Sequence, residues 1–420
     1  MSKEVGPAEV TGSPALLREI NCAKVFTALR GRPPQRLTEL SVRTGLSRPT
    51  VAQAVTQLVE GGWAEYADEA GTDQTAAGRS RIGRPARLVR FRGRAGYVLG
   101  IDIGPHKILA VLADLNGEVV AKRRRDDQFA GSGEEVLAAV RQTITDLLGA
   151  ARVRREDVWS VAVGTPGIVD KPSGAVRMAP SLPGWHGIRL AGALGRSLRC
   201  PVHVENDVNL AVIAERWRGV AVGVHTVVFV QWGARIGAGL IIGDRLHRGS
   251  GGMAGEIGYL SVFGEPDIAS DEAGLGPLER LVGAAAISSA AGSRPGRPAL
   301  RADRRPEELD AEAVFAAART GDVAAAGAVD TVAQRLARGL SALLLLLDPD
   351  MVVLGGGVSA AGEPLLDAIR THLRPLTFTE PVLALSVLGD EATALGAVRT
   401  ALSDVERRVL PHAAQLPDLP

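Results

Sequence analysis

The 420-residue sequence predicts an α/β protein in two parts: a small N-terminal module of three helices and a β-hairpin, and a larger two-lobed domain. The length exceeds that of one ordinary hydrophobic core, so more than one domain is expected. Residues 15–94 hold 14 Lys and Arg against 7 Asp and Glu, although the whole chain carries a net charge of only +1. From residue 96 onward, the helical pattern gives way to strands that alternate with helices and end in glycines.

The composition argues against a membrane protein, a secreted protein and a disulfide-rich protein. No stretch approaches the ~20 consecutive apolar residues of a membrane span, and the N-terminus lacks a basic segment followed by an apolar one. Two cysteines, Cys22 and Cys200, are too few for a disulfide framework or a cysteine-rich zinc site. We therefore expect a soluble cytoplasmic protein whose basic N-terminal part binds a polyanion.

Residues 16–60 show the order of signals that is typical of a helix-turn-helix. Apolar residues recur at helical spacing over 16–30, Gly45 ends a short second helix, and Ser47 is a good N-cap for a third helix over 48–60. The third helix has one apolar stripe, formed by Val51, Val55, Leu58 and Val59. Its start and its other face offer side chains that can hydrogen-bond bases or phosphates, namely Ser47, Arg48, Thr50, Gln53 and Gln57. This pattern predicts that the third helix enters the major groove of DNA.

An arginine-rich segment follows the predicted recognition helix. Residues 78–94 contain seven arginines and no acid, and Leu88, Val89 and Phe91 suit a strand. A strand, a loop and a strand in this place form the wing of a winged helix-turn-helix. We expect Arg81 and Arg84 in the wing to contact the phosphate backbone or the minor groove. The alternative is a solvated linker between domains.

The larger domain repeats one arrangement of strands and helices. Strands are predicted over 97–103, 108–113 and 158–163, with a helix over 135–148. Similar strand signals return after residue 225 and are again followed by helices. Two similar halves with glycines at the ends of their strands indicate an actin-like, sugar-kinase-type ATPase fold with a cleft between two lobes.

Seven motifs in order give the chain a specific resemblance. They are DIGPHKILAVLADLNG (102–117), VAVGTPGIVD (161–170), SLPGWHG (181–187), VENDVNLAVIAE (204–215), GARIGAGLIIGDRLHRGSGGMAGEIGY (233–259), GLGPLE (274–279) and VVLGGGVSAAG (352–362). With these motifs the chain resembles the ROK family, which groups repressors, sugar kinases and proteins of unassigned function. The Gly-Arg-Pro at 83–85 is typical of the repressor branch of that family.

The resemblance implies a set of residues for a sugar pocket. Asp207 stands at the position of the catalytic base in the family's kinases and follows Asn206. Glu256 and Glu279 stand where family members contact sugar hydroxyls, and Tyr259 replaces a histidine of the family pattern. We expect these five residues to hold a sugar or a sugar derivative.

The resemblance also implies that phosphoryl transfer is impaired. Kinases of the family have glycine and threonine before the lysine of the first phosphate loop, where this chain reads Pro105-His106-Lys107, and proline has no N–H to donate. At the second phosphate loop the family's Gly-Thr-Gly is Gly233-Ala234-Arg235, so a long side chain stands where the backbone must approach phosphate closely. We therefore expect no enzymatic activity and no cofactor.

The zinc site of the family is expected to be absent. Its cysteine positions fall on Ser270, Glu272 and Pro277, and its histidine falls on Tyr259. Serine and proline cannot supply a tetrahedral thiolate site, so no metal is expected.

The sequence as a whole predicts a winged helix-turn-helix over 1–94 and a ROK effector and oligomerisation domain over 95–420. The expected function is that of a DNA-binding transcriptional regulator, a repressor of its operator under the control of a sugar-like effector, acting as a homodimer or a dimer of dimers without a membrane. Two other interpretations stay open: an ATP-dependent sugar kinase with an added DNA-binding domain, and a DNA-binding protein that needs no ligand. Residues 404–420 are expected to fray.

Overall fold

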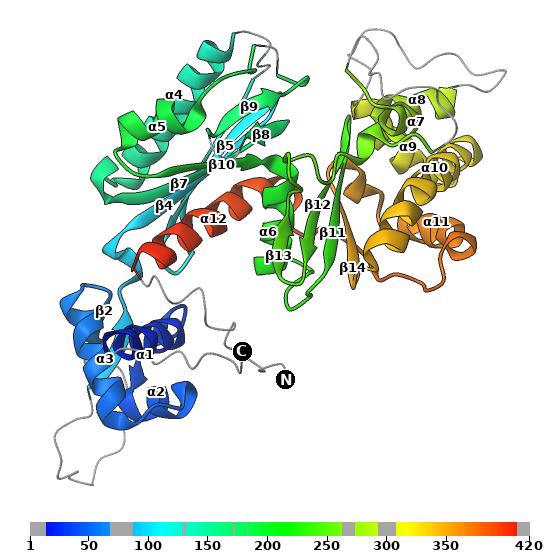
Figure 1. Cartoon of the computed structure of the whole chain (residues 1–420). Helices are drawn as coiled ribbons and strands as arrows, with labels where there is room; N and C mark the ends of the chain where they lie inside the picture. The colour runs from blue at the N-terminus through cyan, green and yellow to red at the C-terminus, as the bar shows by residue number, and fades with distance from the viewer. Residues whose placement is uncertain are drawn as a thin grey trace, which may run out of the picture.

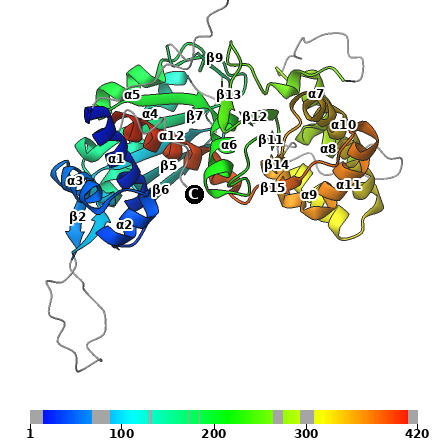
Figure 2. The ribbon, with the colours of Figure 1, turned by 60° about the horizontal axis from the view of Figure 1, so that its bottom comes forward.

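The computed structural model describes residues 14–67, 87–127, 129, 132–170, 173–182, 184–262, 274–292 and 308–409. A small N-terminal module lies below the first of two lobes, and a pair of helices, α6 and α12, lies between the lobes (Figure 1). The module lies on the side of the first lobe, away from the helices of the second lobe (Figure 2). The mixed α/β architecture predicted from the sequence is confirmed.

The N-terminal module combines three helices with a small antiparallel sheet of order β1-β3-β2. Its elements are α1 (Pro14–Leu29), β1 (Gln35–Arg36), α2 (Leu37–Thr44), α3 (Arg48–Glu60), β2 (Ala64–Ala67) and β3 (Leu88–Phe91). Gly45 ends α2 with a φ of 68°, a left-handed conformation that favours glycine, and Ser47 Oγ accepts the N–H of Thr50 at 3.3 Å to cap α3. Thus the helix-turn-helix and the strands of the wing form as predicted. The tip of the wing, with Arg81 and Arg84, lies outside the described residues.

The first lobe is built on a five-stranded sheet of order β10-β7-β4-β5-β6. Helices α4 and α5 pack against the sheet, and α12 packs against its strands β4 and β7. The elements are β4 (Tyr97–Ile103), β5 (Lys107–Asp114), β6 (Val119–Asp126), α4 (Gly133–Ala151), β7 (Val158–Thr165), α5 (Leu190–Leu198) and β10 (Val202–Asn206), with a small hairpin of β8 (Ile168–Asp170) and β9 (Ala175–Met178).

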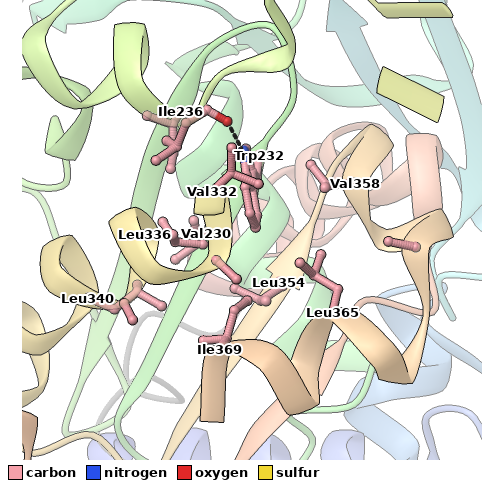
Figure 3. Close-up of a cluster of buried hydrophobic side chains, with 14 of the residues drawn as sticks. Val230, Trp232, Ile236, Val332, Leu336, Leu340, Leu354, Val358, Leu365 and Ile369 are labelled. Atoms are coloured by element: carbon pink, nitrogen blue, oxygen red, sulfur yellow. Dashed lines mark hydrogen bonds between the residues drawn. The ribbon is translucent and has the colours of Figure 1, made fainter. Parts of the chain in front are cut away.

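The second lobe repeats this plan with a sheet of order β13-β12-β11-β14-β15. Its elements are β11 (Val227–Trp232), β12 (Ile236–Ile242), β13 (Arg245–His247), α7 (Pro277–Val282), α8 (Ala284–Gly292), α9 (Glu308–Arg319), α10 (Val323–Leu347), β14 (Met351–Gly355), α11 (Glu363–Leu373) and β15 (Leu383–Leu385). Its core joins Val230 and Trp232 of the sheet to Leu336 of α10 and Ile369 of α11 (Figure 3). The Trp232 indole N–H donates to the carbonyl of Val282 at 2.7 Å, so this buried polar group is satisfied.

Short 3₁₀ turns complete the chain. They are η1 (Gly93–Ala95), η2 (Arg155–Asp157), η3 (Ile257–Tyr259), η4 (Gly357–Ala361), η5 (Arg374–Leu376) and η6 (Gly389–Glu391).

The helices α6 (Asp207–Arg218) and α12 (Ala392–Val409) join the two lobes. Helix α6 packs on β11 and β12 of the second lobe, α12 packs on the first lobe, and the two helices pack on each other. A Cβ on Gly396 of α12 would lie 1.8 Å from the carbonyl oxygen of Leu210 in α6, so the two backbones are in direct contact. The two lobes are therefore joined by two closely packed helices.

One expectation about the C-terminus is wrong. Residues 404–409 were expected to belong to a fraying tail, but they form the last turns of α12. Val405 is buried, and Glu406 is held by two arginines. These contacts order the helix end.

Candidate functional site

The recognition helix α3 presents part of the predicted DNA-binding set to solvent. Ser47, Arg48 and Gln53 are exposed, and Thr50 is half-buried beside the Ser47 hydroxyl, 2.7 Å away. Val51, Val55 and Leu58 are buried against the rest of the module, as the apolar stripe predicts. The helix can therefore lie in a groove without unfolding the module.

Gln57 is exposed like Arg48 and Gln53, but its side chain also has a hydrogen-bond partner on α1. Its amide oxygen accepts a hydrogen bond from the buried Cys22 thiol of α1 at 2.7 Å. The side chain is thus tied to the neighbouring helix, which leaves its amide nitrogen as the group available to DNA. Sequence spacing placed Gln57 on the polar face but could not reveal the cysteine opposite it.

Two arginines near this surface were not singled out from the sequence. Arg43 lies exposed in the last turn of α2, next to the turn that leads to α3. Arg87 of the wing lies over the ring of Tyr66, 5.2 Å from its centroid, in a cation–π contact. The excess of arginine over this segment was the available signal, but it did not distinguish one arginine from another.

All five residues predicted for the sugar pocket line a single cavity of about 120 Å³ between the lobes, namely Asn206, Asp207, Glu256, Tyr259 and Glu279. Asn206 and Asp207 come from the junction of β10 and α6. Glu256 directly precedes η3, Tyr259 is the last residue of η3, and Glu279 lies in α7. Sequence positions more than 70 residues apart are thus brought together, and Arg235 joins them from the turn between β11 and β12.

Asn206 builds the cavity wall around Asp207. Its side-chain oxygen accepts the N–H groups of Val208 and Asn209 at 2.9 and 3.1 Å, which caps α6. Its amide nitrogen donates to the carbonyl of Gly167 at 3.1 Å. Asn206 therefore fixes the direction of the Asp207 side chain at the first position of the helix.

Glu279 is held by the backbone on both oxygens. Oε1 accepts the N–H of Ile236 at 3.0 Å, and Oε2 accepts the N–H of Gly276 at 2.9 Å. The Arg235 guanidinium lies 3.6 Å from Oε2 and donates to the carbonyl of Gly274 at 3.0 Å. Glu279 is thus a fixed, charge-compensated acceptor.

The electrostatics of the cavity follow from its concentration of carboxylates. Burial raises the pKa of Asp207 to about 7, and the charges of Asp102 and Glu256 act in the same direction. Burial and then the charge of Glu279 raise the pKa of Glu256, although Arg235 opposes them. Asp207 can therefore accept a hydrogen bond when it is ionised and donate one when it is protonated.

The first phosphate loop is engaged in contacts within the protein. The Gly104 N–H donates to the carbonyl of Lys107 at 2.8 Å, and Pro105 has no N–H. The Lys107 ammonium lies 3.0 Å from the Asp102 carboxylate and also donates to the carbonyl of Asp390. At the second loop, the Gly233 N–H donates to the carbonyl of Arg235 at 3.0 Å.

Neither a metal cluster nor a membrane helix is found in the part of the chain that the structure describes. No group of three or more His, Cys, Asp and Glu side chains there is arranged to hold a metal ion. Ser270 and Glu272, two of the positions compared with the zinc ligands, lie outside the described residues, so the absence of zinc stays a prediction. None of the described helices is both long and apolar enough to cross a bilayer.

Comparisons with known proteins agree with both parts of the fold. A model of the IclR helix-turn-helix domain matches residues 22–68, and a model of the ROK family matches residues 98–403. The xylose repressor of Caldicellulosiruptor bescii is 26% identical over 403 residues, which cover 94% of this chain and 98% of that protein. The glucokinase of Thermotoga maritima is 30% identical over 309 residues, which cover 71% of this chain and 95% of the glucokinase.

A solved structure shares the arrangement of the whole chain. A ROK family transcriptional regulator, a homologue of the E. coli MLC protein, matches with a TM-score of 0.74 at 22% identity, over 95% of this chain and all of that one. The match covers the helix-turn-helix as well as the two lobes. The chain therefore belongs to the ROK family and carries a helix-turn-helix ahead of its ROK domain.

Proposed function

We propose that this protein is a transcriptional repressor that binds operator DNA through α3 and the wing and responds to a sugar held in the cleft. The observation that supports the proposal is that one chain has both an exposed, polar recognition helix and a carboxylate-lined cavity. Arg48 and Gln53 face solvent on α3, and the carboxylates of Asp207, Glu256 and Glu279 converge in one cavity. Xylose repressors match the chain nearly from end to end, which supports this combination.

The ligand is a single monosaccharide or a small derivative of one. A cavity of about 120 Å³ is small beside the roughly 300–1,000 Å³ of sites for drug-sized ligands. Three carboxylates face it, and the one guanidinium among its lining residues lies beside Glu279. This charge distribution favours hydroxyl donors over phosphate or carboxylate groups, which the carboxylates would repel.

The sugar is bound without being phosphorylated. Transfer from a nucleotide needs backbone N–H groups around its phosphates. Pro105 lacks one, the Gly104 N–H is already bonded, and Lys107 is paired with Asp102. Glucokinases match the ROK part of the chain, so kinase activity is the second candidate function, and the assay below includes it.

The test is fluorescence anisotropy on DNA from upstream of the protein's own gene, with D-xylose and D-glucose as probes. A sugar that binds one lobe arrangement better than the other must change the operator Kd. Asp207→Ala should abolish that change while the Kd without sugar stays within about two-fold. Asp367→Asn, an exposed position in α11, is the matched control and should respond like the wild type.

Two results would contradict the proposal. An unchanged sugar response in Asp207→Ala would place the ligand elsewhere. Turnover of ATP with either sugar as acceptor would establish the kinase in its place. We expect the repressor to act as a homodimer or a dimer of dimers, because an operator with two half-sites needs two recognition helices.

A further inference from the structure

The N-terminal module packs against the first lobe through hydrophobic side chains. One hydrophobic cluster includes Phe26 and Leu29 of α1 together with Val98 of β4 and Val405 of α12. At its edge the rings of Trp63 and Trp159 meet edge to face, with centroids 5.1 Å apart. The module and the first lobe thus share a core that includes the end of α12.

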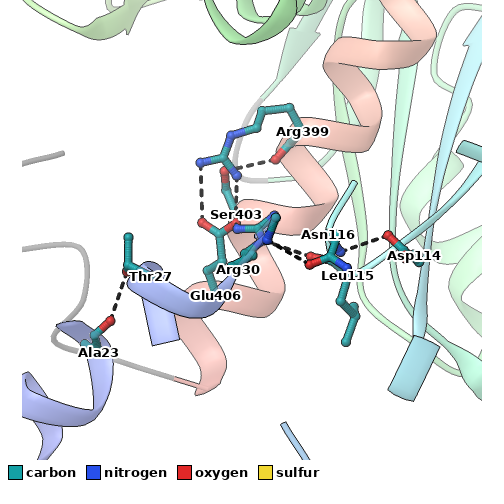
Figure 4. Close-up of polar contacts among 10 residues, drawn as sticks. Ala23, Thr27, Arg30, Asp114, Leu115, Asn116, Arg399, Ser403 and Glu406 are labelled. Atoms are coloured by element: carbon teal, nitrogen blue, oxygen red, sulfur yellow. Dashed lines mark hydrogen bonds and ion pairs between the residues drawn. The ribbon is translucent and has the colours of Figure 1, made fainter. Parts of the chain in front are cut away.

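A polar contact fixes this shared core at its border. Arg30, just after α1, forms an ion pair with Glu406 of α12 and donates to the carbonyl of Leu115 at 2.9 Å (Figure 4). Arg399, two turns earlier on α12, binds the same carboxylate at 2.9 Å and 3.4 Å. Arg30 and Glu406 are only 18% and 23% exposed, so removal of the carboxylate leaves arginines poorly solvated.

The other end of α12 lies at the cleft. The Thr393 hydroxyl donates to the carbonyl of Asp207 at 3.2 Å, and Gly396 contacts the backbone of α6. Just before the helix, Asp390 pairs with Arg124, and its carbonyl accepts from Lys107 of the first phosphate loop. With 18 residues, α12 spans about 27 Å from this end to the module.

We propose that α12 locks the N-terminal module and the first lobe into one rigid body through Glu406, so that closure of the cleft is carried to the recognition helix α3. Since α6 packs mainly on the sheet of the second lobe and α12 packs on that of the first, closure rotates the first lobe about the α6–α12 contact, and the module turns with it. The position of α3 relative to the second lobe then depends on whether the cleft is occupied. This inference rests on the proposed function for its ligand, but the lock itself can be tested without one.

The first experiment is hydrogen exchange on the full chain without ligand. In Glu406→Gln, backbone amides of α1 and β3 should exchange at least ten-fold faster than in the wild type, while those of β4 and β7 stay unchanged. Glu363→Gln, which alters an Arg–Glu pair on α11 far from the module, is the matched control and should change neither set. Unchanged exchange in α1 and β3 of Glu406→Gln would overturn the lock.

The second experiment measures the operator Kd with and without D-xylose or D-glucose. Where the wild type shows a shift of five-fold or more, Glu406→Gln should show less than two-fold, with sugar affinity by calorimetry unchanged. A full shift in the variant would overturn the proposal. If neither sugar shifts the wild type, the proposed response to these sugars fails, and the exchange experiment alone decides the lock.

Discussion

Asp207 and Glu279 line the same cavity, but their surroundings affect the protonation of the two carboxylates differently. Both oxygens of Glu279 accept backbone N–H groups, so its position and charge are set before any ligand arrives. Asp207 lies at the start of α6, where the helix dipole favours its charge, but burial and neighbouring acids outweigh this and raise its pKa to about 7. Asp207 is therefore the residue whose protonation a ligand can change.

Asp207→Asn should make stability less sensitive to pH. The ordinary pKa of 3.8 applies to the unfolded chain, and the folded value is about 7, so the folded state holds the proton over this interval. The wild type must then lose stability as the pH rises from about 4 to about 7, and the loss is complete above that range. The Tm of Asp207→Asn minus the Tm of the wild type should therefore increase by several degrees between about pH 5 and about pH 8. A shift of one pKa unit corresponds to about 1.4 kcal/mol of folding free energy, which is enough to move the Tm by this amount. A Tm difference that stays constant with pH would contradict the shifted pKa.

Substitutions of base-reading residues and of phosphate-binding residues should have different effects on the affinities for operator DNA and for random DNA. Arg48→Ala or Gln53→Ala should weaken operator binding by about 1–3 kcal/mol and affect random DNA little, because lost base contacts matter only at the right sequence. Arg81→Ala or Arg84→Ala should weaken both DNAs and lower the salt dependence of binding. Equal losses on both DNAs for Arg48→Ala would show that it contacts only phosphate. Anisotropy at several salt concentrations makes the measurement.

At the scale of elements, local signals in the sequence predict the positions of individual helices and strands. Contacts between residues far apart in the sequence determine the end of α12 and the lining of the cavity. The strand over 97–103 and the helix over 48–60 agree with β4 and α3 because period, cap and glycine turn act within a few residues. The end of α12 lies in the segment expected to fray, because chain termini are often poorly ordered unless other elements hold them. One of the two arginines that hold Glu406 is Arg30, which lies 376 residues away in the sequence. The cavity residues were identified through family motifs, since no local pattern reports that Glu256 and Asp207 face each other.

Gly396→Ala tests the close contact between α6 and α12. The added Cβ would lie 1.8 Å from the Leu210 carbonyl oxygen, and helical backbone in α6 cannot move aside cheaply. We expect a loss of about 1–3 kcal/mol in the free energy of unfolding, as for other overpacked sites. Gly149→Ala in α4 is the matched control, because a Cβ there meets no atom within 4 Å. It should be neutral or stabilise by about 0.4–1 kcal/mol. Equal denaturation midpoints for the two variants would contradict the close contact.

At the scale of the whole molecule, the positively charged part of the chain does not coincide with a separate hydrophobic core. The surplus of positive charge ends near residue 94, in η1, which supports the proposed boundary between a DNA-binding part and an effector part. The hydrophobic cluster crosses that boundary, because it includes residues of α1, of the first lobe and of the end of α12. The proposed boundary between the two functions thus lies at η1, whereas the hydrophobic core is shared across it.

Deletion of residues 1–94 should therefore do more than remove DNA binding. Val405 and Leu402 of α12 belong to the buried cluster that also includes residues of the N-terminal module. We therefore expect the shortened chain to expose apolar surface worth about 25 cal/mol per Å². We expect residues 95–420 to melt several degrees below the full chain and to bind a hydrophobic dye such as ANS. Full-length Arg48→Ala is the control, because it weakens operator recognition while the exposed Arg48 leaves the core untouched, and its Tm should equal that of the wild type. An unchanged Tm without dye binding in the shortened chain would mean that module and lobe are independent, and it would argue against their movement as one body.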